Sequence, residues 1–367
     1  GTPVPIPNVL MTVEATDDRL QEDGSPLFAP LVNFFETILT HVWYTSNVAT
    51  ISRDIKKAFK LAFDATVEDD FAWLIDYMLH DFGFRGASCV ESAAFGGAGH
   101  LTSFAGTDTV VAIHAGRKYY NTKAMLGHSV MATEHSINTQ RGRDGEVDLI
   151  RELIRKFPGG ILSVVSDSFG IERMVKLYCT ELRSDILGRE DGSKFVVRPD
   201  SPRFDGDTAW DQILWVAQEL GEAFGYTVNS KGYKVLNPKV GIIYGDGLSR
   251  GEIKRTIREL VKSGWAATTC VFGMGGGLLQ KHNRDTERNA FKCCARKEAG
   301  AWVDVKKDPS DFTKKSKGGL LKLIFDNGEY KTVRESEPGE NLLEVVFENG
   351  DIINDITFEE VRENAKV

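Results

Sequence analysis

The chain repeats one pattern between residues 100 and 300: a short apolar run ends in a polar residue or in glycines, and a helical stretch follows. The runs lead to Asp108, His135, Asp167, Asp200, Asp246 and Gly275. Successive members are 27, 32, 33, 46 and 29 residues apart, which is the span of one β/α unit. Such units build either a barrel or a doubly wound open sheet. Six such strand ends favour an α/β fold with an irregular (β/α) barrel, because the functional residues of a doubly wound open sheet lie mainly at its switch point.

The segments on either side of this repeat have different patterns. Residues 29–80 carry apolar residues at three- and four-residue steps, which predicts helices leading into a barrel at 81–300. Residues 301–367 contain two alternating stretches around Asn-Gly turns, which predict β-hairpins. Residues 1–28 also have β character, and we expect part of this N-terminal portion to be missing from the sequence. The two ends together predict a second, smaller β-containing domain.

Composition limits the classes of function. The chain has 367 residues, of which 41% are hydrophobic and 27% charged, as in a soluble globular protein. Its net charge of −8 argues against bulk attraction to nucleic acid or to an anionic membrane. The five cysteines show no CxxC spacing, so we expect a reducing, cytoplasmic compartment and cysteines that serve as small apolar filler. The sequence contains no apolar run of membrane-spanning length.

A glycine-rich stretch, "VFGMGGGLLQK", follows the last apolar run. Adjacent glycines cost backbone entropy, so a strand end that carries them needs positive φ or a close approach by another group. Gly275 and Gly276 precede two cations, Lys281 and Arg284. Bare N–H groups with cations beyond them favour an anion such as phosphate. A tight turn without a ligand explains the same residues equally well.

If the strand ends share one pocket, it holds several carboxylates, one imidazole and several arginines. This mixture suits a phosphorylated sugar, because guanidinium groups and backbone N–H groups bind phosphate oxygens while carboxylates bind hydroxyls or Mg²⁺. Phe82, in "HDFGFRG", can stack on a flat ring. Each residue also has a structural explanation: Phe82 as core, His135 as a structural histidine with its hydrogen bonds satisfied, and Asp167 as a helix cap. From the residues alone, the prediction is a barrel enzyme acting on a phosphorylated sugar or nucleotide.

Other barrel enzymes that act on phosphorylated sugars, such as aldolases or isomerases, need a lysine or glutamate at a strand end. Glu134 is the one residue of these types that is well placed. The lysines of "KKDPSDFTKKSKGG" have the composition of a solvated loop.

The motifs "NVLMTVE", "HDFGFRG", "GTDTV", "EHS", "SVVSDS", "RPDS", "NSKGYKVL", "GDG", "FGMGGGLLQK", "FKC" and "KDP" resemble those of the nicotinamide phosphoribosyltransferases, in the type II phosphoribosyltransferase family. The resemblance extends over the whole chain. It implies an irregular barrel with an added β-containing domain and a homodimer with active sites at the interface. It also implies transfer of a phosphoribosyl group from phosphoribosyl pyrophosphate to nicotinamide, with Mg²⁺ on the pyrophosphate and with ATP stimulating through transient phosphorylation of a histidine.

The resemblance also implies the roles of individual residues. The catalytic group would be His135, Asp167, Asp200 and Arg198, with Asp167 and Asp200 as the partners of the His135 imidazole and with Mg²⁺ near these two carboxylates. The substrate-binding group would be Phe82, Arg85, Asp108, Ser129, Ser163, Gly245, Asp246, Gly275, Gly276, Arg284, Lys292, Lys307 and Lys314. Within it, Phe82 would stack on nicotinamide and Asp108 would accept its carboxamide N–H. Gly275 and Gly276 would hold the 5′-phosphate, and Arg284 would reach across the dimer interface.

Two further functions remain open. A nicotinate phosphoribosyltransferase has a similar pattern, and Asp108 argues against it, because a carboxylate attracts an amide and repels nicotinate. A catalytically silent interaction protein of the same fold is the other alternative, and the intact His135, Asp200 and glycine loop argue against it. The sequence departs from the family in Met274, where better-known members carry serine, and in a shorter loop around Lys314.

Overall fold

The computed structural model describes residues 1–310 and 315–367, which form two compact units. The smaller unit comprises Gly1–Asn47 and Asn283–Asn364, and the larger comprises Val48–His282 and Ala365–Val367. The larger unit thus begins before the predicted start of the barrel at residue 81. It does so because helix α2 (Trp43–Thr66) contributes Phe59, whose ring packs against Phe104 and Phe272.

One sheet of seven parallel strands forms the larger unit's framework within the described residues. The strands are β1 (Leu79–Asp81), β2 (Gly106–Thr107), β3 (Met131–Ala132), β4 (Ile161–Val165), β5 (Lys194–Arg198), β8 (Val240–Tyr244) and β9 (Cys270–Met274). Their spatial order is β2-β1-β9-β8-β5-β4-β3, which is the chain order read cyclically and opened between β2 and β3. A doubly wound sheet reverses direction at a central strand instead. The sheet is therefore a curled half-barrel, and the barrel prediction is confirmed.

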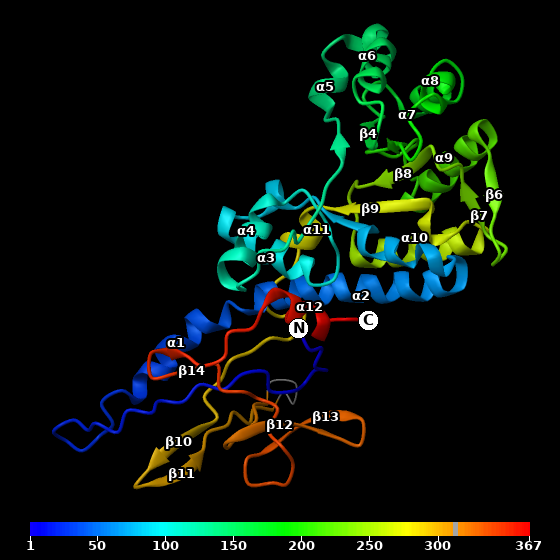
Figure 1. Cartoon of the computed structure of the whole chain (residues 1–367). Coiled ribbons are helices and arrows are strands. Elements are labelled where there is room, and N and C mark those ends of the chain that lie inside the picture. Colours follow the sequence, from blue (N-terminus) through cyan, green and yellow to red (C-terminus); the bar gives the residue numbers. More distant parts are fainter. Residues whose placement is uncertain (311–314) are drawn as a thin grey trace. The chain divides into compact units, whose positions relative to one another are not determined.

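Helices follow the strands, as the β/α spacing predicts, and α9 and α10 lie beside β8 and β9 in Figure 1. The helices after α2 are α3 (Val90–Leu101), α4 (Val110–Tyr119), α5 (His135–Thr139), α6 (Gly142–Lys156), α7 (Ile171–Cys179), α8 (Arg183–Leu187), α9 (Ala209–Phe224), α10 (Arg250–Lys262) and α11 (Gly276–Leu279). Short 3₁₀ turns occupy Asp69–Tyr77, Phe84–Gly86 and Ala267–Thr269, and a hairpin of β6 (Tyr226–Val228) and β7 (Lys234–Leu236) precedes β8. Helix α10 starts at a capping box of Ser249 and Glu252 and buries Ile253, Ile257 and Leu260, the face expected from its sequence.

Alternate residues of each strand point to opposite faces of the sheet. On one face, the side chains of Leu162, Phe195 and Phe272 are almost completely buried, as expected of parallel strands covered by helices. On the other face, His80 pairs with both Gly106 and Gly273 in register, and Arg198 pairs with Val165. Because all the strands run parallel, their carboxyl ends reach the same edge of the sheet.

The smaller unit is built from short antiparallel hairpins and two helices. It contains α1 (Ala29–Thr40), β10 (Ala295–Glu298), β11 (Ala301–Asp304), β12 (Leu321–Asp326), β13 (Glu329–Arg334), β14 (Phe347–Glu348), β15 (Asp351–Ile352) and α12 (Phe358–Asn364). Both Asn-Gly turns form hairpins as predicted, since Asn327, Gly328, Asn349 and Gly350 all have positive φ.

The β character expected for residues 1–28 is wrong for most of that segment. It contains no strand, only an isolated bridge between Leu20 and Pro26. The three prolines within "GTPVPIP" lack the N–H groups that a strand ladder requires. The segment is joined to β13 through side chains instead, since the Val9 N–H donates to Thr332 Oγ1 over 2.9 Å.

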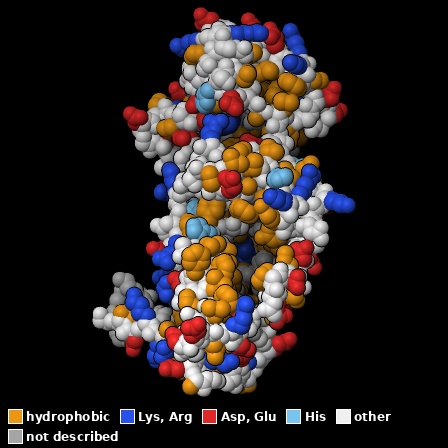
Figure 2. Space-filling view, turned by 90° about the vertical axis from the view of Figure 1, so that its left-hand side faces the viewer, with side chains coloured by type: hydrophobic (Ala, Val, Ile, Leu, Met, Phe, Trp, Pro, Cys, Tyr) orange, Lys and Arg blue, Asp and Glu red, His pale blue; other side chains and the backbone are white. Residues whose placement is uncertain are grey.

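Acidic and basic side chains are interspersed on the face shown in Figure 2. No helix of the described ranges is long and apolar enough to cross a membrane. All five cysteines are free. Cys270 is buried, as expected of an apolar filler, but Cys89 and Cys293 are exposed and do not fit that interpretation.

Candidate active site

The strand-end residues of the larger unit come together at the carboxyl edge of the half-barrel. Phe82 follows β1, and its backbone N–H donates to the Met274 carbonyl at the end of β9 over 3.0 Å. Its ring lies over glycines, because a Cβ atom on Gly273 would come within 2.1 Å of the ring and one on Gly245 within 3.2 Å. The guanidinium of Arg198 lies 5.2 Å from the ring centroid. The half-buried Phe82 is therefore held in a glycine-lined position beside a cation, which differs from an ordinary core position.

Asp108 follows β2, the strand next to β1, and its side chain is exposed. Its backbone N–H donates to the Asp81 carbonyl over 2.9 Å, and Ser129 Oγ donates to its Oδ1 over 2.5 Å. Burial lowers the pKa of nearby His80, and the charge of Asp108 opposes that shift. Asp108, Ser129 and the β1 residues thus form one group, as the sequence predicted for the first two.

His135 is the first residue of α5, directly after β3. Its Nε2 lies 2.8 Å from Asp167 Oδ1, and Ser201 Oγ donates to Asp167 Oδ2 over 2.7 Å. The His135 side chain is 48% exposed, so the ring is accessible from solvent while one of its nitrogens is paired with Asp167. Arg85 lies 3.8 Å from the carboxylate of Glu134, the residue before the histidine.

Arg198 and Asp200 form a second pair, with Arg198 Nη2 2.9 Å from Asp200 Oδ1. The expected contact of Asp200 with His135 is thus replaced by one with Arg198. Partial burial raises the pKa of Asp246, and the negative charges of Asp200 and Asp167 raise it further. The three carboxylates therefore lie within electrostatic reach of one another, an arrangement that favours a cation or a polyhydroxylated ligand.

The glycine stretch divides into two kinds of position. Gly273 and Gly277 are required by close approach, since a Cβ atom on Gly277 would lie 2.5 Å from the Leu248 carbonyl oxygen. A Cβ atom on Gly276 would have no neighbour within 4 Å, and one on Gly275 would contact only the Phe82 carbonyl oxygen, at 3.6 Å. The backbone at Gly275 and Gly276 therefore borders open space, as a phosphate-binding turn requires.

The remaining predicted residues lie elsewhere. Ser163 is buried within β4, where its carbonyl accepts the Thr133 N–H over 3.0 Å. Three predicted cations belong to the smaller unit: Arg284 pairs with Asp285, Lys292 pairs with Glu36, and the Lys307 N–H donates to Ser316 Oγ. Lys314 lies outside the described residues.

Sequence reasoning missed His80 and Asp81, which are both buried beside Phe82. The signal was present in "LHDFGFRG", where a histidine and a carboxylate interrupt an apolar strand next to an aromatic ring.

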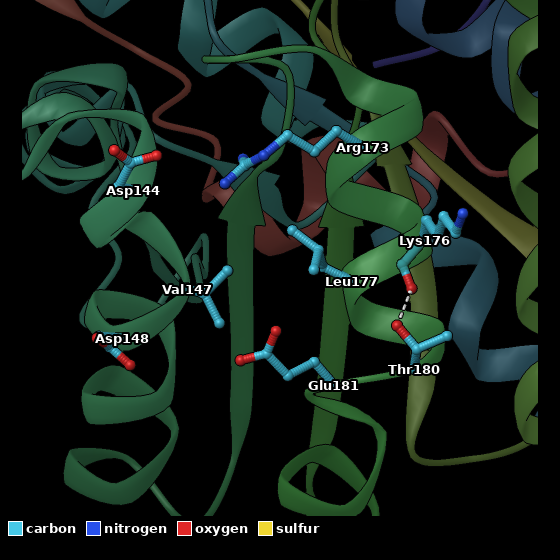
Figure 3. Close-up of a pocket in the computed structure, with 8 residues that line it drawn as sticks. All are labelled: Asp144, Val147, Asp148, Arg173, Lys176, Leu177, Thr180 and Glu181. Atoms are coloured by element: carbon cyan, nitrogen blue, oxygen red, sulfur yellow. Dashed lines mark hydrogen bonds between the residues drawn. The ribbon is translucent and has the colours of Figure 1, made fainter.

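A cavity of about 540 Å³ opens between α6 and α7, away from the strand-end residues described above (Figure 3). Asp144, Val147 and Asp148 line it from α6, and Arg173, Lys176 and Leu177 line it from α7. No strand-end residue contributes to it. In the part of the chain that the structure describes, no group of three histidine, cysteine, aspartate or glutamate side chains could hold a metal ion by itself.

The parallel half-barrel and its strand-end groups define an α/β-barrel enzyme of the phosphoribosyltransferase class. The chain belongs to the nicotinate phosphoribosyltransferase (NAPRTase) family, whose model matches residues 77–351.

Curated relatives carry a more specific name. A nicotinamide phosphoribosyltransferase of Xanthomonas campestris pv. campestris is 41% identical over all of this chain and 77% of its own length. A protein of the same name from Acinetobacter baylyi is 35% identical over 91% of this chain and 69% of its own length. Among solved structures, a nicotinate phosphoribosyltransferase from Saccharomyces cerevisiae is similar at 14% identity and a TM-score of 0.42, over 65% of this chain and 51% of that one.

Proposed function

We propose that the chain transfers the phosphoribosyl group of phosphoribosyl pyrophosphate to nicotinamide, forming nicotinamide mononucleotide and pyrophosphate in NAD salvage. The names of the curated relatives support this reaction. The observation that carries the proposal is that Phe82 and Asp108 follow adjacent parallel strands, so an aromatic face and a carboxylate lie at the same edge of the sheet.

These two side chains suit nicotinamide. The pyridine ring stacks on Phe82, an offset contact worth about 1 kcal/mol. One oxygen of the Asp108 carboxylate accepts the carboxamide N–H of nicotinamide. Ser129 Oγ donates to the other carboxylate oxygen and holds it in place. The same carboxylate repels nicotinate, so the site selects the amide by electrostatic discrimination.

The residues present suit the charged half of the second substrate. Gly275 and Gly276 offer backbone N–H groups to the 5′-phosphate. Mg²⁺ usually binds through one or two carboxylates together with substrate phosphates, so a site without three protein ligands fits it. Asp167 and Asp200, the carboxylates expected near the ion, would hold it, with Asp246 within electrostatic reach of both. When bound, Mg²⁺ supplies positive charge to the pyrophosphate.

The reaction breaks the bond between the anomeric carbon and pyrophosphate and forms a bond from that carbon to the pyridine nitrogen. Arg198 stabilises the negative charge of the departing pyrophosphate. Phe82 and Asp108 hold the nitrogen in line with the anomeric carbon, which reduces the entropic part of the barrier. No general base is needed, because the pyridine nitrogen carries no proton.

His135 is then free to act on phosphate. Its Nε2 faces Asp167, which fixes the orientation of the ring, so its Nδ1 is the nitrogen that can take the phosphoryl group of ATP. ATP stimulation is part of the proposal. So are a cytoplasmic homodimer and the phosphate contacts of Arg284, Lys292, Lys307 and Lys314.

The test is a comparison of the two bases in the full-length natural protein. We expect kcat/KM for nicotinamide to exceed that for nicotinate by about 100-fold, as repulsion between two like charges can supply once the bound base excludes solvent from the Asp108 carboxylate. Asp108→Asn removes the repulsion and narrows the ratio, whereas Ser129→Ala, the matched control, keeps the carboxylate and most of the preference. A preference of the unmutated protein for nicotinate would overturn the assignment. Absence of turnover with either base would favour the catalytically silent interaction protein.

A further inference from the structure

We infer that Asp81 is a positioning residue that holds Phe82 and Asp108 at the spacing a flat base requires. The inference rests on the proposed function, because it takes those two residues as the base-binding pair. Asp81 ends β1 and is completely buried, so it does not itself touch a ligand.

Asp81 is hydrogen-bonded to the backbone on both sides of the base-binding pair. Its side-chain Oδ1 accepts the Gly83 N–H over 2.7 Å, which fixes the peptide that follows Phe82. Its backbone carbonyl accepts the Asp108 N–H over 2.9 Å. One residue therefore sets the start of the turn that carries the ring and the position of the carboxylate on the next strand.

The Asp81 carboxylate lies on the helix-facing side of the sheet, where it is tightly enclosed. Asp81 pairs in register with Thr107 and Met274 on the neighbouring strands. A Cβ atom on Gly97 of α3 would come within 3.2 Å of Asp81 Oδ2. Oδ2 faces Thr109, the residue before α4, but no hydrogen bond of ordinary geometry joins the two side chains. A Cβ atom on Gly97 would also come within 2.6 Å of Ala112 Cβ on α4, so a glycine here lets α3 and α4 pack closely around the carboxylate.

This enclosure is energetically costly, which argues for a function. Burial raises the pKa of Asp81 to about 6, and the charge of Asp108 raises it further. Burial lowers the pKa of His80 on the same strand, so this imidazole does not offset the cost. A buried carboxyl group without a cationic partner is rarely retained for stability alone.

The experiment compares Asp81→Ala and Asp81→Asn in the full-length protein. Alanine removes the acceptor for the Gly83 N–H, and we expect KM for the base to rise by about tenfold or more, as a small misplacement of a binding group produces. KM for phosphoribosyl pyrophosphate should rise by less than KM for the base, because Arg198 and Asp200, which bind its pyrophosphate, lie at the end of β5 and do not contact Asp81, although Gly275 follows β9 beside β1. Asparagine keeps an acceptor at Oδ1 and should restore KM for the base to within about threefold of the unmutated value.

Ser103→Ala is the matched control, because it also removes a buried polar side chain, but one that makes no hydrogen bond to the base-binding pair. It should leave both KM values unchanged. An equal rise of both KM values in Asp81→Ala, or no rise for the base, would overturn the inference.

The test is independent of which base the enzyme uses. If the unmutated protein prefers nicotinate, the same comparison with nicotinate decides the role of Asp81. If neither base is turned over, a crystal structure of Asp81→Ala decides it. A Phe82 ring still 5.2 Å from Arg198, with the Gly83 peptide unmoved, would refute the positioning role, and a displaced ring would support it.

Discussion

The two sides of the strand-end edge are held in place by different forces. At the β1–β2 side, Phe82 and Asp81 are fixed by close packing, since the glycines at 97, 106 and 273 leave only the room that Ala112, His80 and Phe82 need, respectively. At the β4–β5–β8 side, His135, Arg198 and the carboxylates are more exposed and are arranged as charged pairs.

The difference matches two kinds of ligand. A flat neutral base is recognised by shape, which requires a rigid surface. A pyrophosphate is recognised by charge, which tolerates solvent and some adjustment of side chains. We therefore expect packing changes to affect the base selectively and charge changes to affect phosphate chemistry selectively.

Arg198 belongs to both sides, so its removal should have the largest effect. Arg198→Ala removes the cation beside Phe82 and leaves Asp200 without its partner. We expect kcat/KM to fall by about 100- to 1,000-fold, the range for loss of one group that stabilises developing charge. Steady-state kinetics should show both KM values raised together with a lower kcat. Arg198→Lys keeps the charge without the planar fork, and an effect confined to one substrate would show that the two sides are not coupled through this residue.

Sequence patterns predicted the residues of the β4–β5–β8 side, the charged side, better than those of the β1–β2 side, the packed side. His135, Asp167, Asp200 and Asp246 each follow an apolar run, and polar residues at the carboxyl ends of parallel strands are easy to recognise. Their partners were harder to predict, because side-chain pairing depends on how the sheet curls. Asp200 was expected beside His135, yet it pairs with Arg198 on β5.

The packed side depends on contacts between residues far apart in the chain. The reason for Gly273 is the ring of Phe82, about 190 residues earlier, and no local pattern contains that information. Asp81 was overlooked for the same reason, since its burial under α3 is a tertiary property.

The next largest expected effect is that of Asp81 on the free energy of unfolding. Its pKa is raised from 3.8 to about 6, so the folded state holds a proton that the unfolded state loses between these pH values. The free energy of unfolding therefore falls as pH rises from about 4 to 6, by up to about 3 kcal/mol, and is constant above that range. The Asp81→Asn variant has no carboxyl group to ionise at this position, so it does not lose this stability. The difference in Tm between the variant and the unmutated protein should therefore grow between pH 4 and pH 6 and then level off. Thermal unfolding at several pH values measures it, and a gain already complete at pH 4 would contradict the burial argument.

Two glycine substitutions compare steric fit with open space. Gly273→Ala places a methyl group against the Phe82 ring, which should cost about 1–3 kcal/mol of stability and raise KM for the base. Gly276→Ala meets no neighbour, so Tm should stay nearly unchanged while KM for phosphoribosyl pyrophosphate rises. Thermal unfolding and the two KM values form the measurement. If both variants affected the same KM, the assignment of separate base and phosphate sides would be wrong.

The smallest expected effect concerns the His135–Asp167 pair. In Asp167→Asn, the Ser201 hydroxyl still donates to the side-chain oxygen, which turns the amide N–H₂ toward His135 Nε2. That contact favours the tautomer with its proton on Nδ1, the nitrogen proposed to receive the phosphoryl group. We therefore expect the ratio of rates with and without ATP to fall by about tenfold, while turnover without ATP is nearly unchanged. Ser201→Ala keeps the Asp167 charge and serves as the control, with most of the ATP stimulation retained. A loss of ATP-independent turnover in Asp167→Asn would mean that the pair acts on the base transfer itself, and the separation between shape recognition and charge recognition would then not extend to the histidine.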